Sequence, residues 1–200
     1  MDKCETMFKR KKQEKSKLNC ERGFDNAFRQ ETEQEINIKE NEQRVYRIKD
    51  ISLDEESELE DQGYQKVLIR DLKGQQNLYL FKPFFHESPR HAITVFEIVE
   101  YLKKFHNIKV KQYLSRSPDI VFEVNKKKYA IEVETGTILK RNKDQIYGKI
   151  ANLKYYYHRN WFFVVTDRNL VKSYKRFGKT YSKRNILGKI YKIIIHTAWL

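Results

Sequence analysis

The 200-residue sequence predicts an α/β domain in which helices and strands alternate over the second half of the chain. Three observations support this. An apolar stripe at helical spacing begins at Ala92, two runs rich in β-branched and aromatic residues flank a polar turn near Asn125, and a nearly continuous apolar run begins at Trp161. Hydrophobic residues make up 40% of the chain, and Gly and Pro are few. This composition favours a folded core over a disordered or fibrous chain.

Changes in composition divide the chain into three parts. Residues 1–50 are dense in Lys, Glu, Gln and Asn without a sustained helical period, which predicts a charged arm that is partly disordered or helical. Residues 51–86 form a small helix–strand–strand unit. Its helix begins at the capping-box pair Ser52 and Glu55, and its two strands, 64–69 and 77–81, flank a turn at Lys73-Gly74. This unit is either an independent lobe or packs on the main domain, residues 87–200.

The main domain is predicted to begin with a helix over residues 92–105, followed by a strand at 109–114. Glu100 lies at the border of the apolar stripe of this helix, and Glu97 lies farther out. Two strands joined by the polar turn follow. A second helix comes after Asn142, with a buried stripe at Ile146, Ile150, Leu153 and Tyr157. A strand at 161–166, a basic helix or loop at 172–188 and a last strand at 190–196 complete the predicted order.

Three of the four carboxylates in the stretch from residue 116 to 136 are predicted to lie close together. Side chains alternate along a strand, so Glu132 and Glu134 share one face, about 6.5–7 Å apart, opposite Tyr129, Ile131 and Val133. Asp119 opens the preceding strand. A turn at Asn125-Lys126 would place it opposite Glu132, and a turn at Lys126-Lys127 would place it opposite Glu134. Both registers predict three carboxylates within reach of one hard cation, and hence a metal site.

The formal net charge of +14 lies entirely in the second part of the chain. Residues 81–200 hold 25 Lys and Arg against nine Asp and Glu, whereas residues 1–80 hold 16 against 18. Asp119, Glu132 and Glu134 are three of those nine acids. A basic domain with its acids concentrated at one point suits a polyanion held beside a cation. This distribution predicts a nucleic-acid partner.

Cysteine content and hydropathy indicate the compartment. Cys4 and Cys20 lie in the polar N-terminal part without metal-binding spacing, so neither a disulfide scaffold nor a zinc site is expected. No apolar run approaches the length of a membrane span, and the charged N-terminus lacks the apolar stretch of a signal peptide. We therefore expect a cytoplasmic protein without a membrane partner.

Pro118-Asp119, followed thirteen residues later by Glu132-Val133-Glu134 within an αβββαβ order, resembles the PD-(D/E)XK nuclease superfamily. The resemblance covers about residues 88–197. It implies a restriction-endonuclease-like core, a mixed central sheet flanked by helices. It also implies that Asp119 and Glu132 bind Mg²⁺ or Mn²⁺, and that the third motif residue helps to activate the attacking water.

The sequence departs from the family pattern at that third position, where Glu134 replaces Lys. Some restriction endonucleases of this fold are similar in having Glu there, which leaves Glu134 as a metal ligand or a base. Other members supply the lysine from the following helix. Lys149 is the best-placed candidate here, with Lys140 and Lys154 as alternatives.

The sequence thus predicts a Mg²⁺-dependent DNA endonuclease whose catalytic residues are Asp119, Glu132, Glu134 and Lys149. The predicted contacts to the DNA backbone are Lys126, Lys127, Lys128, Lys140, Arg141, Gln145 and the basic segment 172–184. A homodimer would favour double-strand cleavage over nicking, but no residue predicts one. The alternatives are a catalytically inactive module of the same fold that binds nucleic acid or assembles with a mobile-element or DNA-processing complex, and an accessory protein that binds a partner through its charged arm.

Overall fold

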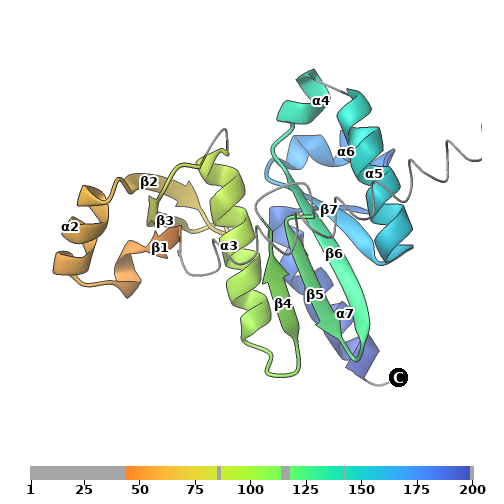
Figure 1. The fold of residues 1–200 in the computed structure, drawn as a ribbon, viewed down its shortest axis with the longest axis horizontal. Helices are drawn as coiled ribbons and strands as arrows, with labels where there is room; N and C mark the ends of the chain where they lie inside the picture. Colours follow the sequence, from red (N-terminus) through yellow and green to blue (C-terminus); the bar gives the residue numbers. More distant parts are fainter. Residues whose placement is uncertain (1–43, 85–86, 114–117, 142, 199–200) are drawn as a thin grey trace, which may run out of the picture. The chain divides into compact units, whose positions relative to one another are not determined.

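The computed structural model describes residues 44–84, 87–113, 118–141 and 143–198 (Figure 1). These residues form a three-stranded sheet in the order β1-β3-β2 and a five-stranded sheet in the order β4-β5-β6-β7-β8. The prediction of an α/β protein with flanking helices is confirmed. Most of the predicted arm, residues 1–43, lies outside the described residues.

The five-stranded sheet is mixed. Its strands are β4 (Lys109–Gln112), β5 (Ile120–Val124), β6 (Lys127–Glu134), β7 (Trp161–Val165) and β8 (Thr180–Ser182). The pairs β4–β5 and β5–β6 are antiparallel, whereas β6–β7 and β7–β8 are parallel. The carboxyl ends of β6, β7 and β8 therefore meet at one edge of the sheet.

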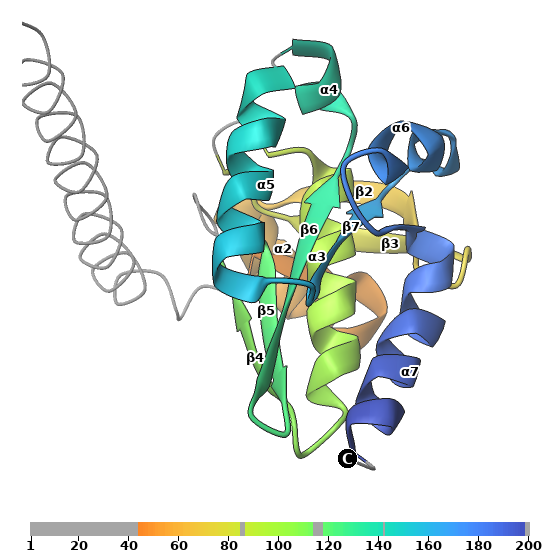
Figure 2. The same cartoon turned by 90° about the vertical axis from the view of Figure 1, so that its right-hand side faces the viewer.

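Helices cover both faces of this sheet. The helices of the main domain are α3 (Pro89–Lys103), α4 (Thr137–Arg141), α5 (Lys143–Tyr157), α6 (Val171–Lys175) and α7 (Ile186–Ala198), with short 3₁₀ turns η2 (Arg168–Leu170) and η3 (Lys183–Asn185). One core packs α3 and α7 against Ile120, Ile131 and Val164, and the other packs α5 and α6 against Ala130 and Phe163. Figure 2 shows α5 on one side of the sheet and α3 and α7 on the other.

A tight turn fixes the register of the β5–β6 hairpin. Asn125 and Lys126 both have positive φ angles, 47° and 64°, and Val124 pairs with Lys127. Two successive residues in the left-handed region give the turn the twist that suits a two-residue hairpin. The turn is therefore Asn125-Lys126, the first of the two predicted registers. Asp119 directly precedes the Ile120–Ile131 pair and so lies opposite Glu132.

The N-terminal unit packs on the main domain. It comprises β1 (Val45–Arg47), η1 (Ile48–Asp50), α2 (Leu53–Asp61), β2 (Gln65–Arg70) and β3 (Gln76–Phe81). The predicted capping box of α2 is confirmed, and Val45, Tyr79 and Phe81 form a core with Ala92 and Ile93 of α3. The packing alternative is therefore correct, and the predicted arm is too long, because its last residues form β1 beside β3.

Contact with this unit also buries Glu97, which the sequence pattern had placed on the outer side of the helix. The helical pattern placed Glu97 away from the apolar stripe, but it is only 6% exposed. Its carboxylate accepts hydrogen bonds from the Leu72 N–H at 2.9 Å and the Tyr79 hydroxyl at 2.7 Å. Glu100 pairs with Lys103 at the surface. The outer side of α3 is thus a second packing surface.

The prediction for the C-terminal segment is partly wrong. Residues 190–196 belong to α7, not to a strand. The β-branched run Ile193-Ile194-Ile195 favoured a strand, but Ile186, Ile190 and Ile194 are buried at spacings of four, which is a helical period. The short strand β8 was not predicted. Among the described helices, α7 included, none is long and apolar enough to cross a membrane.

Candidate functional site

The strands β5 and β6 bring the carboxylates of Asp119 and Glu132 to the same end of the hairpin. The hairpin register places Asp119 at the start of β5, beside the end of β6 that carries Glu132. The Asp119 carboxylate accepts a hydrogen bond from the backbone N–H of Val133 at 2.6 Å. The side chain of Asp119 is therefore fixed against the residue that follows Glu132.

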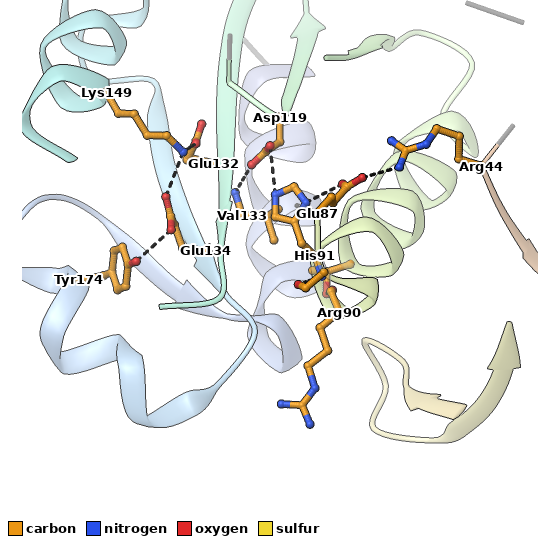
Figure 3. A network of polar contacts seen from close by, with 12 residues as sticks. Arg44, Glu87, Arg90, His91, Asp119, Glu132, Val133, Glu134, Lys149 and Tyr174 are labelled. Atoms are coloured by element: carbon orange, nitrogen blue, oxygen red, sulfur yellow. Dashed lines mark hydrogen bonds and ion pairs between the residues drawn. The ribbon is translucent and has the colours of Figure 1, made fainter. Parts of the chain in front are cut away.

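A cationic side chain from α5 lies between the two glutamates of β6. Lys149 donates a hydrogen bond to Glu132 and another, at 3.2 Å, to Glu134. The second oxygen of Glu134 accepts a hydrogen bond from the Tyr174 hydroxyl of α6 at 2.9 Å. Figure 3 shows these four side chains converging from β6, α5 and α6. Both carboxylate oxygens of Glu134 therefore accept hydrogen bonds from other side chains of the protein.

Burial disfavours the charged forms of the carboxylates in this cluster. Glu132 and Glu134 are each 3% exposed. Burial raises the pKa of Glu132 to about 8, Asp119 and Glu134 add to the rise, and Lys149 opposes it. Burial disfavours the charged form of Lys149, but its attraction to Glu132, Glu134 and Asp119 is stronger and raises its pKa above the ordinary value. One ammonium therefore does not neutralise the three carboxylates.

A second chain of contacts holds Asp119 from the side of α3. His91 Nε2 lies 3.1 Å from Asp119 Oδ1, and His91 Nδ1 lies 2.8 Å from Glu87. Arg44 pairs with Glu87 at 2.7 Å (Figure 3). Ser88 caps α3 by accepting a hydrogen bond from the His91 N–H. The helix start therefore places the imidazole beside the metal-ligand candidate Asp119.

Contact with two carboxylates keeps His91 charged. Burial disfavours the imidazolium, but hydrogen bonds and attraction to Asp119 and Glu87 raise the pKa of His91 to about 10. Since both ring nitrogens then donate, His91 orients one oxygen of Asp119. Burial would raise the pKa of Glu87, but His91 and Arg44 lower it.

His91 and Tyr174 are site residues that the sequence interpretation missed. The predicted helix began at residue 92, directly after His91, which received no role, and Tyr174 fell within the basic segment predicted to contact the DNA backbone. The spacing of Glu87 and His91 suits an i, i+4 contact, which is a weak signal for this chain of contacts. No local pattern marks Tyr174, because its contact to Glu134 joins residues forty positions apart.

The donor chemistry of the site fits a hard divalent cation. Asp119 and Glu132 offer anionic oxygens, the ligands that Mg²⁺ prefers. Within the described residues no group of three or more His, Cys, Asp or Glu side chains is arranged to hold a metal. Both oxygens of Glu134 are engaged by Lys149 and Tyr174, and the predicted metal ligation by Asp119, Glu132 and Glu134 stays a prediction.

The other predicted contact residues lie elsewhere or stay untested. The exposed lysines of the hairpin turn, Lys126, Lys127 and Lys128, are at the opposite end of β6, with Lys127 about 17 Å from Glu132 by strand rise. Lys154 and Gln145 are exposed on α5. Lys140 and Arg141 end α4, directly after the site, but their side chains lie outside the described structure. The predicted role of all these residues in binding DNA stays a prediction.

Comparisons of the chain with models of protein families, with curated proteins and with solved structures gave no match. A function is therefore inferred from the site itself.

Proposed function

We propose that the protein is a metal-dependent nuclease that hydrolyses phosphodiester bonds in DNA, with a PD-(D/E)XK-type site on a restriction-endonuclease-like core. The observation that carries the proposal is the meeting of Asp119, Glu132 and Lys149 at one end of the β5–β6 hairpin. The element order α3-β4-β5-β6-α5-β7, with three antiparallel strands and a parallel fourth, agrees with this assignment.

In this proposal Asp119 and Glu132 hold Mg²⁺ or Mn²⁺, which would neutralise phosphate charge and lower the pKa of a bound water. Lys149 replaces the lysine that the motif lacks at position 134 and contacts the phosphate or the attacking water. Glu134 orients Lys149, and Tyr174 orients Glu134. These contacts favour that positioning role over the predicted role of Glu134 as metal ligand or base.

A second candidate function is a nucleic-acid-binding module of the same fold without catalysis, acting in a mobile-element or DNA-processing complex. One observation favours it. The ammonium of Lys149 already balances part of the charge of Glu132 and Glu134, as a cation at this place would. The basic surface would then bind DNA without a cutting reaction.

Cleavage assays separate the two functions. The purified full chain is incubated with supercoiled plasmid and with linear DNA, in Mg²⁺ or Mn²⁺ and in EDTA, beside the variant Glu132→Gln. The nuclease proposal expects metal-dependent cutting that Glu132→Gln abolishes while DNA binding persists. DNA binding without any metal-dependent cutting would support the second candidate and reject the first. Cutting that persists undiminished in Glu132→Gln would place the reaction at another site.

A further inference from the structure

A basic pocket lies beside the proposed active site. It has a volume of about 620 Å³ and lies between η2 and α6 on one side and β8 and η3 on the other. Its lining includes Arg168, Lys172 and Lys175 together with Ser182 and Asn185. Figure 2 shows α6 at the end of the sheet toward which β6 points. The pocket is therefore at the same edge as the carboxylates.

The charge of the pocket is of one sign. Among the described residues that line it there are three cations and no Asp or Glu. Three cations at one concave surface repel one another, so an anion there lowers the free energy. A guanidinium, two ammonium groups, a hydroxyl and an amide are the donors that bind phosphate oxygens in proteins.

Ser182 adds a hydroxyl-bearing residue to the lining of the pocket. It is only 8% exposed, and it occupies the N-cap position of η3 without a capping hydrogen bond from its side chain. A serine at an N-cap ordinarily accepts a bond from the backbone. Ser182 lines the pocket without making that capping bond.

Strand pairing gives the separation between this pocket and the proposed active site. Glu134 pairs with Val165 of β7, and Val165 pairs with Ser182 of β8. Two interstrand spacings separate Glu134 from Ser182, or about 10 Å. Tyr174, which bonds Glu134, lies between Lys172 and Lys175 on α6. The helix that supplies two pocket lysines thus also reaches the carboxylate cluster.

We propose that this α6–β8 pocket binds a phosphate group of the nucleic-acid strand close to the bond at the carboxylates. The inference rests on the proposed function, because it takes the same strand to cross both places. The phosphate is either a 5′-terminal monoester or an internal diester, since the donors of the pocket suit both.

Binding measurements with matched variants test the pocket. Glu132→Gln serves as a background that prevents cutting, in EDTA, with labelled duplexes that carry either a 5′-phosphate or a 5′-hydroxyl. The double variant Lys172→Gln/Lys175→Gln is compared with Lys104→Gln/Lys192→Gln, which removes the same charge from exposed lysines outside the pocket. Arg168→Gln is a second pocket variant. Circular dichroism and thermal melts confirm that each variant folds.

We expect the pocket double variant to weaken binding at least about tenfold, because charge-assisted contacts are lost. The salt slope of log K should fall by about one, since the pocket holds one phosphate group and each lost phosphate contact contributes about 0.9. Arg168→Gln should lower it by about one. The control double variant should leave both quantities unchanged. A loss confined to the 5′-phosphorylated duplex assigns the terminal monoester, and an equal loss on both duplexes assigns an internal diester.

Equal effects of the pocket and control variants, or no DNA binding at low salt, would overturn the pocket proposal. Cleavage by the wild-type protein is measured in parallel. Pocket-dependent binding without cleavage would reject the nuclease function and leave the pocket standing, whereas cleavage with unaltered binding by the pocket variants would reject the pocket alone.

Discussion

Glu97 and Glu132 are both buried glutamates in one domain, but their surroundings differ. Glu97 is 6% exposed and accepts hydrogen bonds from the Leu72 N–H and the Tyr79 hydroxyl, with Arg47 3.5 Å away. Glu132 is 3% exposed, contacts Lys149 and faces the charges of Asp119 and Glu134. The first carboxylate joins two packed units, and the second is crowded by like charges.

The difference indicates which buried acid belongs to a functional site. A buried carboxylate with neutral donors and one cation is satisfied by the fold. A buried carboxylate whose pKa is raised by burial and by neighbouring acids is only partly compensated by the cations around it. Such strongly shifted carboxylates are typical of functional sites. On this physical ground we assign Glu97 to architecture and Glu132 to chemistry.

The largest expected effect is that substitutions at the two glutamates have opposite consequences: one lowers the cleavage rate and the other lowers the stability of the fold. Glu132→Gln should lower the cleavage rate by about 10²–10³ or more, the usual effect of removing a preorganised charged group, with no loss of stability. Glu97→Ala should destabilise the fold by about 2–3 kcal/mol, because Leu72 N–H and Tyr79 hydroxyl lose their acceptor. Urea unfolding and cleavage per folded molecule give the two quantities. A stable Glu97→Ala variant that cuts poorly would reverse the assignment.

Removal of the Lys149 ammonium tests directly whether Glu132 and Glu134 require a positive charge beside them. Lys149→Met should lower metal-free stability by about 2 kcal/mol, less than for a fully buried pair because Lys149 is 31% exposed. Mg²⁺ should restore part of that loss, since the carboxylates gain another cation. Thermal melts with Mg²⁺ and with EDTA measure both effects.

The control for Lys149 is Lys154→Met, on the same helix but exposed. It should change neither the melting temperature nor its response to Mg²⁺. If Lys149→Met were as stable as Lys154→Met in EDTA, Lys149 would not balance the carboxylates.

The raised pKa of Glu132 predicts how stability depends on pH. The folded state holds its proton more tightly than the unfolded chain, whose pKa is near 4.5, so ionisation of Glu132 removes stability as pH rises from 4.5 to about 8. The stability advantage of Glu132→Gln over the wild type, in EDTA, should therefore grow through that window and level off above it.

The comparison with Glu132→Gln also removes the effect of His91. Its raised pKa contributes stability below pH 6.5 that is lost toward pH 10 in both proteins. Urea unfolding at several pH values measures the difference between the proteins. A difference that is constant from pH 4 to pH 9 would contradict the raised pKa of Glu132.

The smallest expected effect concerns the turn that aligns Asp119 with Glu132. Lys126 has a φ of 64°, which costs a residue with a side chain but not glycine. Lys126→Gly should therefore stabilise the protein by about 0.5–1 kcal/mol in urea unfolding without altering the site. The same substitution at exposed Lys128, within β6, should destabilise it. Destabilisation by Lys126→Gly would contradict the assigned register.

Local pattern was sufficient for most elements and for the hairpin. The capping box at Ser52, the stripe of α5 and the fully buried β7 are local features, because capping, helical period and continuous apolarity depend on neighbouring residues. The alternation of Glu132 and Glu134 with Ile131 and Val133 placed both acids on one face, and the structure has the same alternation. Local propensity failed at α7, where three consecutive isoleucines favoured a strand but burial at spacings of four required a helix.

The sequence by itself determined the strand faces, the paired acids of β6 and the concentration of basic charge around them. Only the tertiary structure decided which partners those acids have. His91, Tyr174 and the N-terminal unit over Glu97 meet their carboxylates across 18 to 40 positions of chain. Sequence spacing does not encode such contacts, because they depend on how α3, α6 and β3 pack around the sheet. Packing therefore separates the glutamate that supports the fold from the one that we assign to catalysis.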